Sequence, residues 1–158
     1  MKECGPCSLC CKLLNVPGLA RAGEMCRYCK PGTQEGCCTI HDDRPEVCLG
    51  YNCFWRAESW PDELRPDRVG VIFEALPGVK TVLVSVEPST PDAWKEKEVL
   101  RVIGILRKKR RPVVLKTQND STMFIPDGMG REDVLRDIRQ VLNWQETQKW
   151  RSQHIQPT

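Results

Sequence analysis

The sequence lacks long hydrophobic stretches and a recognisable export signal. Each absence argues against one class of protein, the first against membrane proteins and the second against secreted proteins. Its apolar runs are only a few residues long, as in GVIFEAL (Gly70 to Leu76), whereas a membrane-spanning helix needs about 20 apolar residues. The N-terminus has no apolar segment followed by a small-residue cleavage site, so we expect no secretory signal peptide. We therefore expect a cytoplasmic protein without a membrane partner, in a compartment that keeps thiols reduced.

Cysteine is missing from residues 54–158, because all ten cysteines lie between Cys4 and Cys53. Disulfides are rare in reducing compartments, and neither C-x2-C pair follows the strand that a thioredoxin-like redox site needs. Catalysis by a nucleophilic cysteine needs a nearby histidine base, yet the chain has only two histidines for ten thiols. Metal binding is the interpretation that remains. Apart from the metal site we see no catalytic constellation, so whether the chain is an enzyme stays open.

The cysteine spacing repeats a short step that suits metal ions. Residues 4–11 read C-x2-C-x2-C-C, residues 26–29 add a second C-x2-C, and residues 37–38 form another adjacent pair. A C-x2-C step lets two sulfurs converge on one ion within a tight turn. Two neighbouring cysteines project in different directions, so they could serve two separate metal centres. The repeated step therefore indicates one or two metal centres.

The identity of the metal stays open. Cys4, Cys7 and Cys10 match the first three ligands of a bacterial four-iron cluster motif. No Cys-Pro follows them, so the fourth thiolate of a cluster would come from a distant position such as Cys48 or Cys53. Tetrahedral zinc takes four thiolates from any loops that supply them. Both Zn²⁺ and an iron–sulfur cluster fit the spacing.

The motifs CGPCSLCCKLL, CRYCKPG and GCCTIHDDRPEVCLGYNCFW together resemble the CxxCxxCC zinc- or iron-chelating domain family, the YkgJ-like proteins. The resemblance covers residues 4–56, about a third of the chain. It implies metal chelation without assigning a reaction. Together with the spacing, it implies that the metal ligands are Cys4, Cys7, Cys10, Cys11, Cys26, Cys29, Cys38, Cys48 and Cys53.

Two positions depart from the family pattern. Cys37 is an extra thiol beside Cys38, which is the cysteine that matches the family. His41 stands where the family has a tyrosine, and a tyrosine position favours packing or hydrogen bonding over metal ligation. Whether Cys37 or His41 binds metal stays open, and neither belongs to the expected ligand set.

The part of the chain after the cysteines alternates between strand and helix patterns. Two β-branched runs around the turn PGVK predict a hairpin, and two more surround Asn119 and Asp120. Apolar residues at helical spacing predict a helix after each of the first and second strand pairs. The order ββαββα predicts a small antiparallel sheet with helices on one face, and an α+β class. The predicted ranges are strands 69–76, 81–87, 112–118 and 121–126, and helices 89–111 and 131–150.

We expect two parts, a cysteine-rich N-terminal module (residues 1–57) without a regular apolar pattern and a supporting α+β region (residues 67–151). The basic run RKKRRP at residues 107–112 could bind nucleic acid. No aromatic residue stands beside it to stack on bases, so we interpret it as a solvated helix end and expect no nucleic-acid partner. The main hypothesis is a metal-binding protein with a possible protein partner. The alternatives are an iron–sulfur redox or accessory protein, and a zinc-stabilised nucleic-acid or protein adaptor.

Overall fold

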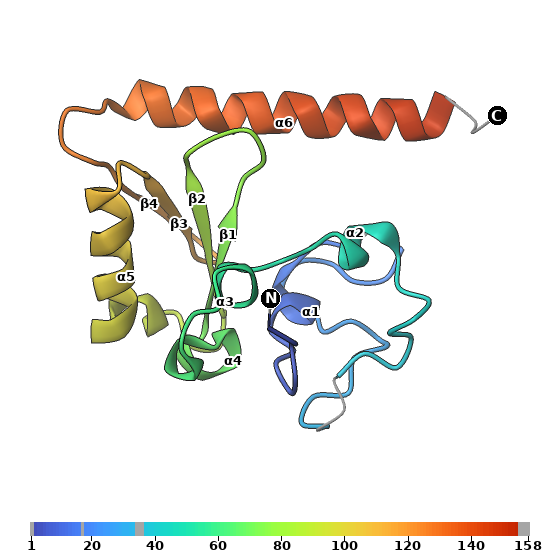
Figure 1. Cartoon of the computed structure of the whole chain (residues 1–158). Helices are drawn as coiled ribbons and strands as arrows, with labels where there is room; N and C mark the ends of the chain where they lie inside the picture. Colours follow the sequence, from blue (N-terminus) through green and yellow to red (C-terminus); the bar gives the residue numbers. More distant parts are fainter. Residues whose placement is uncertain (1, 17, 34–36, 155–158) are drawn as a thin grey trace.

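The computed structural model describes residues 2–16, 18–33 and 37–154, with side chains described as far as residue 142. An irregular cysteine-rich segment comes first, and a four-stranded sheet with helices follows it (Figure 1). The predicted α+β class is confirmed. The order of the second half, two strands, a helix, two strands and a helix, is confirmed as well.

The sheet is mixed, although the sequence predicted an antiparallel one. Strands β1 and β2 pair antiparallel, as do β3 and β4, but β2 and β3 pair parallel, with Val82 opposite Val113. Helix α5 causes this difference, because it returns the chain to the end of the sheet where β2 began, and parallel neighbours need such a crossover. The strands lie in the order β1-β2-β3-β4. Their bounds are β1 Val71–Ala75, β2 Val82–Val86, β3 Val113–Lys116 and β4 Ser121–Phe124.

Two long helices accompany the sheet, and the other helical segments are single turns. The long helices are α5 (Lys97–Lys108) and α6 (Arg131–His154). Of the helices in the described part of the chain, none combines the length and hydropathy needed to cross a membrane. The short segments are α1 (Cys10–Leu13), α2 (Glu46–Leu49), α3 (Phe54–Ala57), α4 (Pro66–Val69) and the 3-10 turns η1 (Asp62–Leu64) and η2 (Ala93–Lys95).

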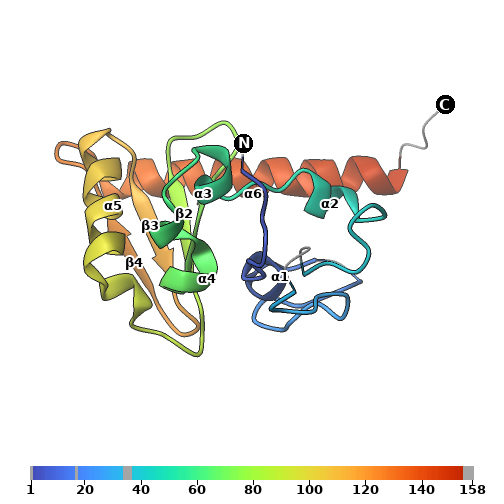
Figure 2. The same cartoon turned by 60° about the horizontal axis from the view of Figure 1, so that its bottom comes forward.

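The alternation of side chains along β1 places different parts of the protein on its two faces. Val71 and Phe73 belong to the main core, which also contains the buried side chains of α5. Ile72 lies between them in sequence and points to the opposite face, where it packs against Cys7 and Leu9. The N-terminal module and α5 therefore lie on opposite sides of the sheet (Figures 1 and 2).

Helix α6 packs beside the turn between β1 and β2. Oδ2 of Asp137 accepts a hydrogen bond from the Thr81 hydroxyl at 2.6 Å, and Val134 and Val141 are buried. The helix then continues past the sheet on the side where the N-terminal module lies (Figure 1).

Candidate metal centre

Three cysteines from distant parts of the N-terminal module come together. The Sγ atoms of Cys11, Cys29 and Cys37 all lie within 4.8 Å of one another. Those of Cys11 and Cys37 are 3.8 Å apart. Cys29 and Cys37 are buried, and Cys11 is partly buried. These residues are called the cysteine trio below, and their spacing is close enough to hold one metal ion.

Backbone hydrogen bonds bring the trio together. The N–H of Cys26 donates to the carbonyl of Cys11, and the N–H of Cys29 donates to the carbonyl of Cys26, both at 2.9 Å. The N–H of Lys30 donates to the carbonyl of Cys37 at 2.7 Å. These bonds join the three segments that carry the trio through the C-x2-C turn.

The surroundings of the trio favour protonated thiols when no metal is bound. A hydrogen bond with Cys10, followed by burial, raises the pKa of Cys11. Burial raises the pKa of Cys29 to about 12. A hydrogen bond with Cys11, followed by burial, raises the pKa of Cys37. A metal ion that binds these sulfurs must displace protons, because thiolates are the ligands.

The chemistry of the trio suits a thiophilic metal. Thiolate ligands select zinc, iron in iron–sulfur clusters, or Cu(I) over the hard cations that prefer oxygen. Three thiolates leave one position of a tetrahedral ion for a further ligand. The donor set therefore fits the zinc or iron expected from the sequence.

One member of the trio was missing from the predicted ligand set. Cys11 and Cys29 were predicted, whereas the expected set contained Cys38 and left open whether its neighbour Cys37 binds. The bond from Lys30 to the Cys37 carbonyl holds residue 37 beside the C-x2-C turn. His41 is not in the trio, since its ring is exposed and its Nδ1 lies 3.3 Å from a carboxylate oxygen of Asp42.

The other predicted ligands do not belong to the trio. Cys38 forms an isolated antiparallel bridge with Cys29. Cys48 lies in α2, and its pKa is raised by burial and then by the nearby thiols of Cys26 and Cys38. The remaining five are Cys4, which is exposed, Cys7, which is buried, and Cys10, Cys26 and Cys53, which are partly buried.

The basic run at the end of α5 is used within the protein. Nε of Arg107 donates to the carbonyl of Ile125 at 3.1 Å. Arg110 donates to the Asp127 carbonyl at 2.8 Å, and Arg111 to the Lys80 carbonyl at 3.2 Å. These arginines bond the backbone of neighbouring loops, which agrees with their interpretation as part of a helix end.

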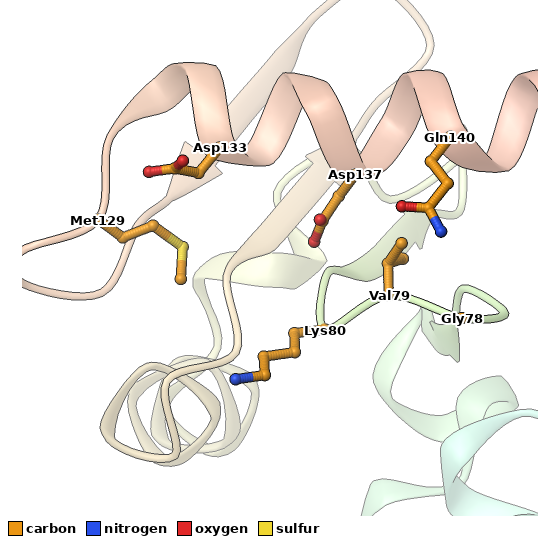
Figure 3. Close-up of a pocket in the computed structure, with 7 residues that line it drawn as sticks. All are labelled: Gly78, Val79, Lys80, Met129, Asp133, Asp137 and Gln140. Atoms are coloured by element: carbon orange, nitrogen blue, oxygen red, sulfur yellow. The ribbon is translucent and has the colours of Figure 1, made fainter.

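A pocket of about 460 Å³ lies between α6 and the turn between β1 and β2 (Figure 3). Its two carboxylates are engaged, because Asp137 accepts from Thr81 and Asp133 accepts from the N–H of Gly130 at 2.9 Å. No cysteine lines this pocket. The pocket is thus a space between α6 and the hairpin of β1 and β2, and it is separate from the candidate metal ligands.

A larger groove, of about 810 Å³, separates the N-terminal module from the loop after β2. Lys12 and Glu87 both line it, and their side chains pair with each other at 2.7 Å. The groove therefore presents a neutralised ion pair beside the segment that carries Cys11.

Comparisons with known proteins add no relative to this description. No family model matches the chain, and no curated protein and no solved structure matches it. The geometry of the cysteines is thus the basis on which a function can be assigned.

Proposed function

We propose that this is a cytoplasmic metal-binding protein, in which the cysteine trio and Cys26 bind Zn²⁺ or iron through four thiolates. The observation that carries the proposal is the convergence of three Sγ atoms within 4.8 Å from residues 11, 29 and 37. Free cysteines rarely gather this closely without a metal or disulfide chemistry to use them, and disulfides are disfavoured in a reducing compartment.

Cys26 is the proposed fourth ligand because its backbone contacts two segments of the trio. It donates to the carbonyl of Cys11 and accepts from the N–H of Cys29. The C-x2-C step from Cys26 to Cys29 is the arrangement with which structural zinc sites bind one ion through two sulfurs. Rotation of the Cys26 side chain would then complete the tetrahedron.

The metal would organise the N-terminal module, residues 1–57, and the α+β region, residues 67–151, would support it. The helices within residues 1–57 are single turns, so few regular hydrogen bonds hold this segment. In such small sites the free energy of metal binding is also free energy of folding. The resemblance of residues 4–56 to the CxxCxxCC family supports the same chemistry.

The test is the metal content of the protein, purified without oxygen and without added chelator, together with its visible absorption spectrum. We expect zinc or iron bound near-stoichiometrically in the wild type. The variant Cys37→Ser should lose the metal held by the trio, because it removes a buried ligand. Zinc bound to thiolates gives a colourless protein, whereas an iron–sulfur cluster gives a brown one.

The matched control is Val47→Ala, which shortens an exposed side chain of α2 and removes no thiol. It should keep the metal that Cys37→Ser loses. A folded, metal-free wild type would contradict the proposal, and so would a Cys37→Ser variant that keeps the full metal content.

A further inference from the structure

We propose a second metal centre, separate from the trio, whose ligands are the thiolates of Cys4, Cys7, Cys10 and Cys53. It goes beyond the proposed function because it adds a binding site with its own ligands. The two centres would meet at the adjacent residues Cys10 and Cys11, each of which would serve one of them.

The first support for the second centre comes from contacts on the face of the sheet that carries Ile72. Cys7 packs with Leu9 and Ile72 in a small buried cluster, and the partly buried Cys10 and Cys53 pack against the same cluster. Cys53 is 43 positions from Cys10 in sequence, so the fold and not the motif brings it here. Three cysteines thus contact one small cluster on the face of the sheet that carries Ile72.

Backbone hydrogen bonds place Cys4 at the same site. The N–H of Cys7 donates to the carbonyl of Cys4 at 3.2 Å, which closes the first C-x2-C turn. Two bonds then join the N-terminus to the segment after Cys53. The N–H of Lys2 donates to the Arg56 carbonyl at 3.2 Å, and Nε of Arg56 donates to the Lys2 carbonyl at 2.8 Å. Residues 2–7 are therefore held beside the start of α3, which Cys53 immediately precedes.

The neighbours Cys10 and Cys11 contact different groups of thiols. The Sγ of Cys11 lies in the trio, whereas Cys10 packs against the cluster of Cys7 and Ile72. One adjacent pair would therefore supply one ligand to each centre. Three ligands from a C-x2-C-x2-C run and a fourth from a distant loop suit either an iron–sulfur cluster or a tetrathiolate zinc ion, and the shared chemistry is a thiolate-bound metal.

The experiment is a titration of the reduced, metal-free full chain with Co²⁺, which absorbs visible light when thiolates bind it. We expect about two Co²⁺ per chain in the wild type, because each four-thiolate centre takes one ion. Cys53→Ser should bind about one ion, and Cys29→Ser about one ion, because each removes a ligand from a different centre. Cys4→Ser should match Cys53→Ser, and its exposed position keeps the core intact if Cys53→Ser fails to fold.

Val47→Ala is the matched control, because it shortens an exposed side chain of α2 and removes no thiol, and it should still bind about two Co²⁺ ions per chain. A wild type that binds about one ion, lost in Cys29→Ser but kept in Cys53→Ser and Cys4→Ser, would overturn the second centre and leave the proposed function standing. Absence of any Co²⁺ binding would contradict both proposals. Reconstitution with iron and sulfide under nitrogen then separates the metals, because a brown product that Cys53→Ser cannot form assigns a cluster to this centre.

Discussion

Nζ of Lys12 lies 2.7 Å from Oε1 of Glu87, and this ion pair joins the cysteine-bearing segment to the end of strand β2. Glu87 is only 8% exposed and also accepts hydrogen bonds from the N–H and hydroxyl of Ser89. The Lys12 side chain is partly exposed, but breaking this pair is costly because it leaves the buried charge of Glu87 unpaired. We expect Lys12→Met, which keeps the aliphatic stem, to lower the free energy of unfolding by about 3 kcal/mol in urea denaturation.

The exposed pair of Arg101 and Glu98 on α5 is the matched control. Arg101→Met should cost less than about 1 kcal/mol, since exposed ion pairs contribute little. Equal losses in Lys12→Met and Arg101→Met would refute the structural role of Lys12. Burial opposes ionisation of Glu87, but Lys12 and Ser89 outweigh it, so its pKa is below the ordinary 4.5. The stabilisation is therefore complete above pH 4.5 and is lost as the pH falls through the folded-state pKa.

Gly70 must remain a glycine at the junction between α4 and β1. Its φ of +67° lies in the left-handed region, and an added Cβ would approach Ala93 Cβ and Thr90 Oγ1 at 2.9 Å. We expect Gly70→Ala to lower the free energy of unfolding by about 1–3 kcal/mol, through backbone strain and this clash. The control is Gly104→Ala in α5, where a Cβ meets nothing within 4 Å. That variant should be neutral or up to about 1 kcal/mol more stable, and a matching loss in both would contradict the explanation.

Glu74 is a partly buried carboxyl whose charge destabilises the folded protein. Burial raises its pKa above the ordinary 4.5, although a hydrogen bond from the Tyr51 hydroxyl at 3.1 Å opposes the shift. The folded state therefore keeps this proton longer than the unfolded state, and stability falls as the pH rises from 4.5 to the folded-state pKa. Glu74→Gln keeps the acceptor and removes the charge. It should have a higher melting temperature at pH 7 and lose this part of the pH dependence.

Tyr51→Phe tests the same pair from the other side. It removes the hydroxyl that donates to Glu74, so the carboxyl loses the contact that favours its charged form. We expect a lower free energy of unfolding at pH 7. We also expect its fall with rising pH to continue to a higher pH than in the wild type. An unchanged pH profile in both variants would show that Glu74 is not the titrating group.

Metal binding to the trio should release protons. The pKa values of Cys11, Cys29 and Cys37 are all raised, so these groups are thiols at neutral pH. A metal ion binds them as thiolates, and at least three protons should leave for each ion that the trio binds. Calorimetric titrations in buffers of different ionisation enthalpy measure this number. Affinity should rise with pH, and proton release near zero would contradict thiolate ligation.

In the metal-free protein, Cys11 and Cys37 should form a disulfide when a peroxide is added. Their sulfurs are 3.8 Å apart. Cys11 is the more exposed of the two. The small fraction of Cys11 that is ionised attacks the peroxide to give a sulfenic acid, and the Cys37 sulfur then attacks this sulfenic acid to form the disulfide with loss of water. Peptide mapping without reductant identifies the pair. Cys37→Ser should stop at the sulfenic acid, Cys48→Ser should behave like the wild type, and any other dominant pairing would refute the prediction.

The strands and long helices could be predicted because local pattern and fold agree there. The alternation in β2 matches its burial pattern, with Val82, Val84 and Val86 buried. The apolar spacing of α5 matches the buried residues Val99 and Ile103. The parallel pairing of β2 and β3 could not be predicted from such patterns, because it depends on which end of the sheet α5 returns the chain to.

The candidate site was predictable in composition but not in grouping. Cysteine spacing indicated metal and included Cys11 and Cys29, yet it could not distinguish Cys37 from Cys38. The two cysteines are adjacent in sequence, and what distinguishes them is a backbone contact. The N–H of Lys30, which follows the C-x2-C turn, donates to the carbonyl of Cys37. The approach of Cys53 to Cys7 likewise depends on the packing of both against the sheet.

The contact of Ile72 with Cys7 and Leu9 gives the N-terminal module a protective role as well. Ile72 is 1% exposed and lies in β1, which forms an edge of the sheet. If metal loss unfolds the module, the face of this edge strand that carries Ile72 becomes bare. An uncovered apolar edge strand is a template for pairing between chains. Metal supply would then govern whether newly made chains stay monomeric or aggregate.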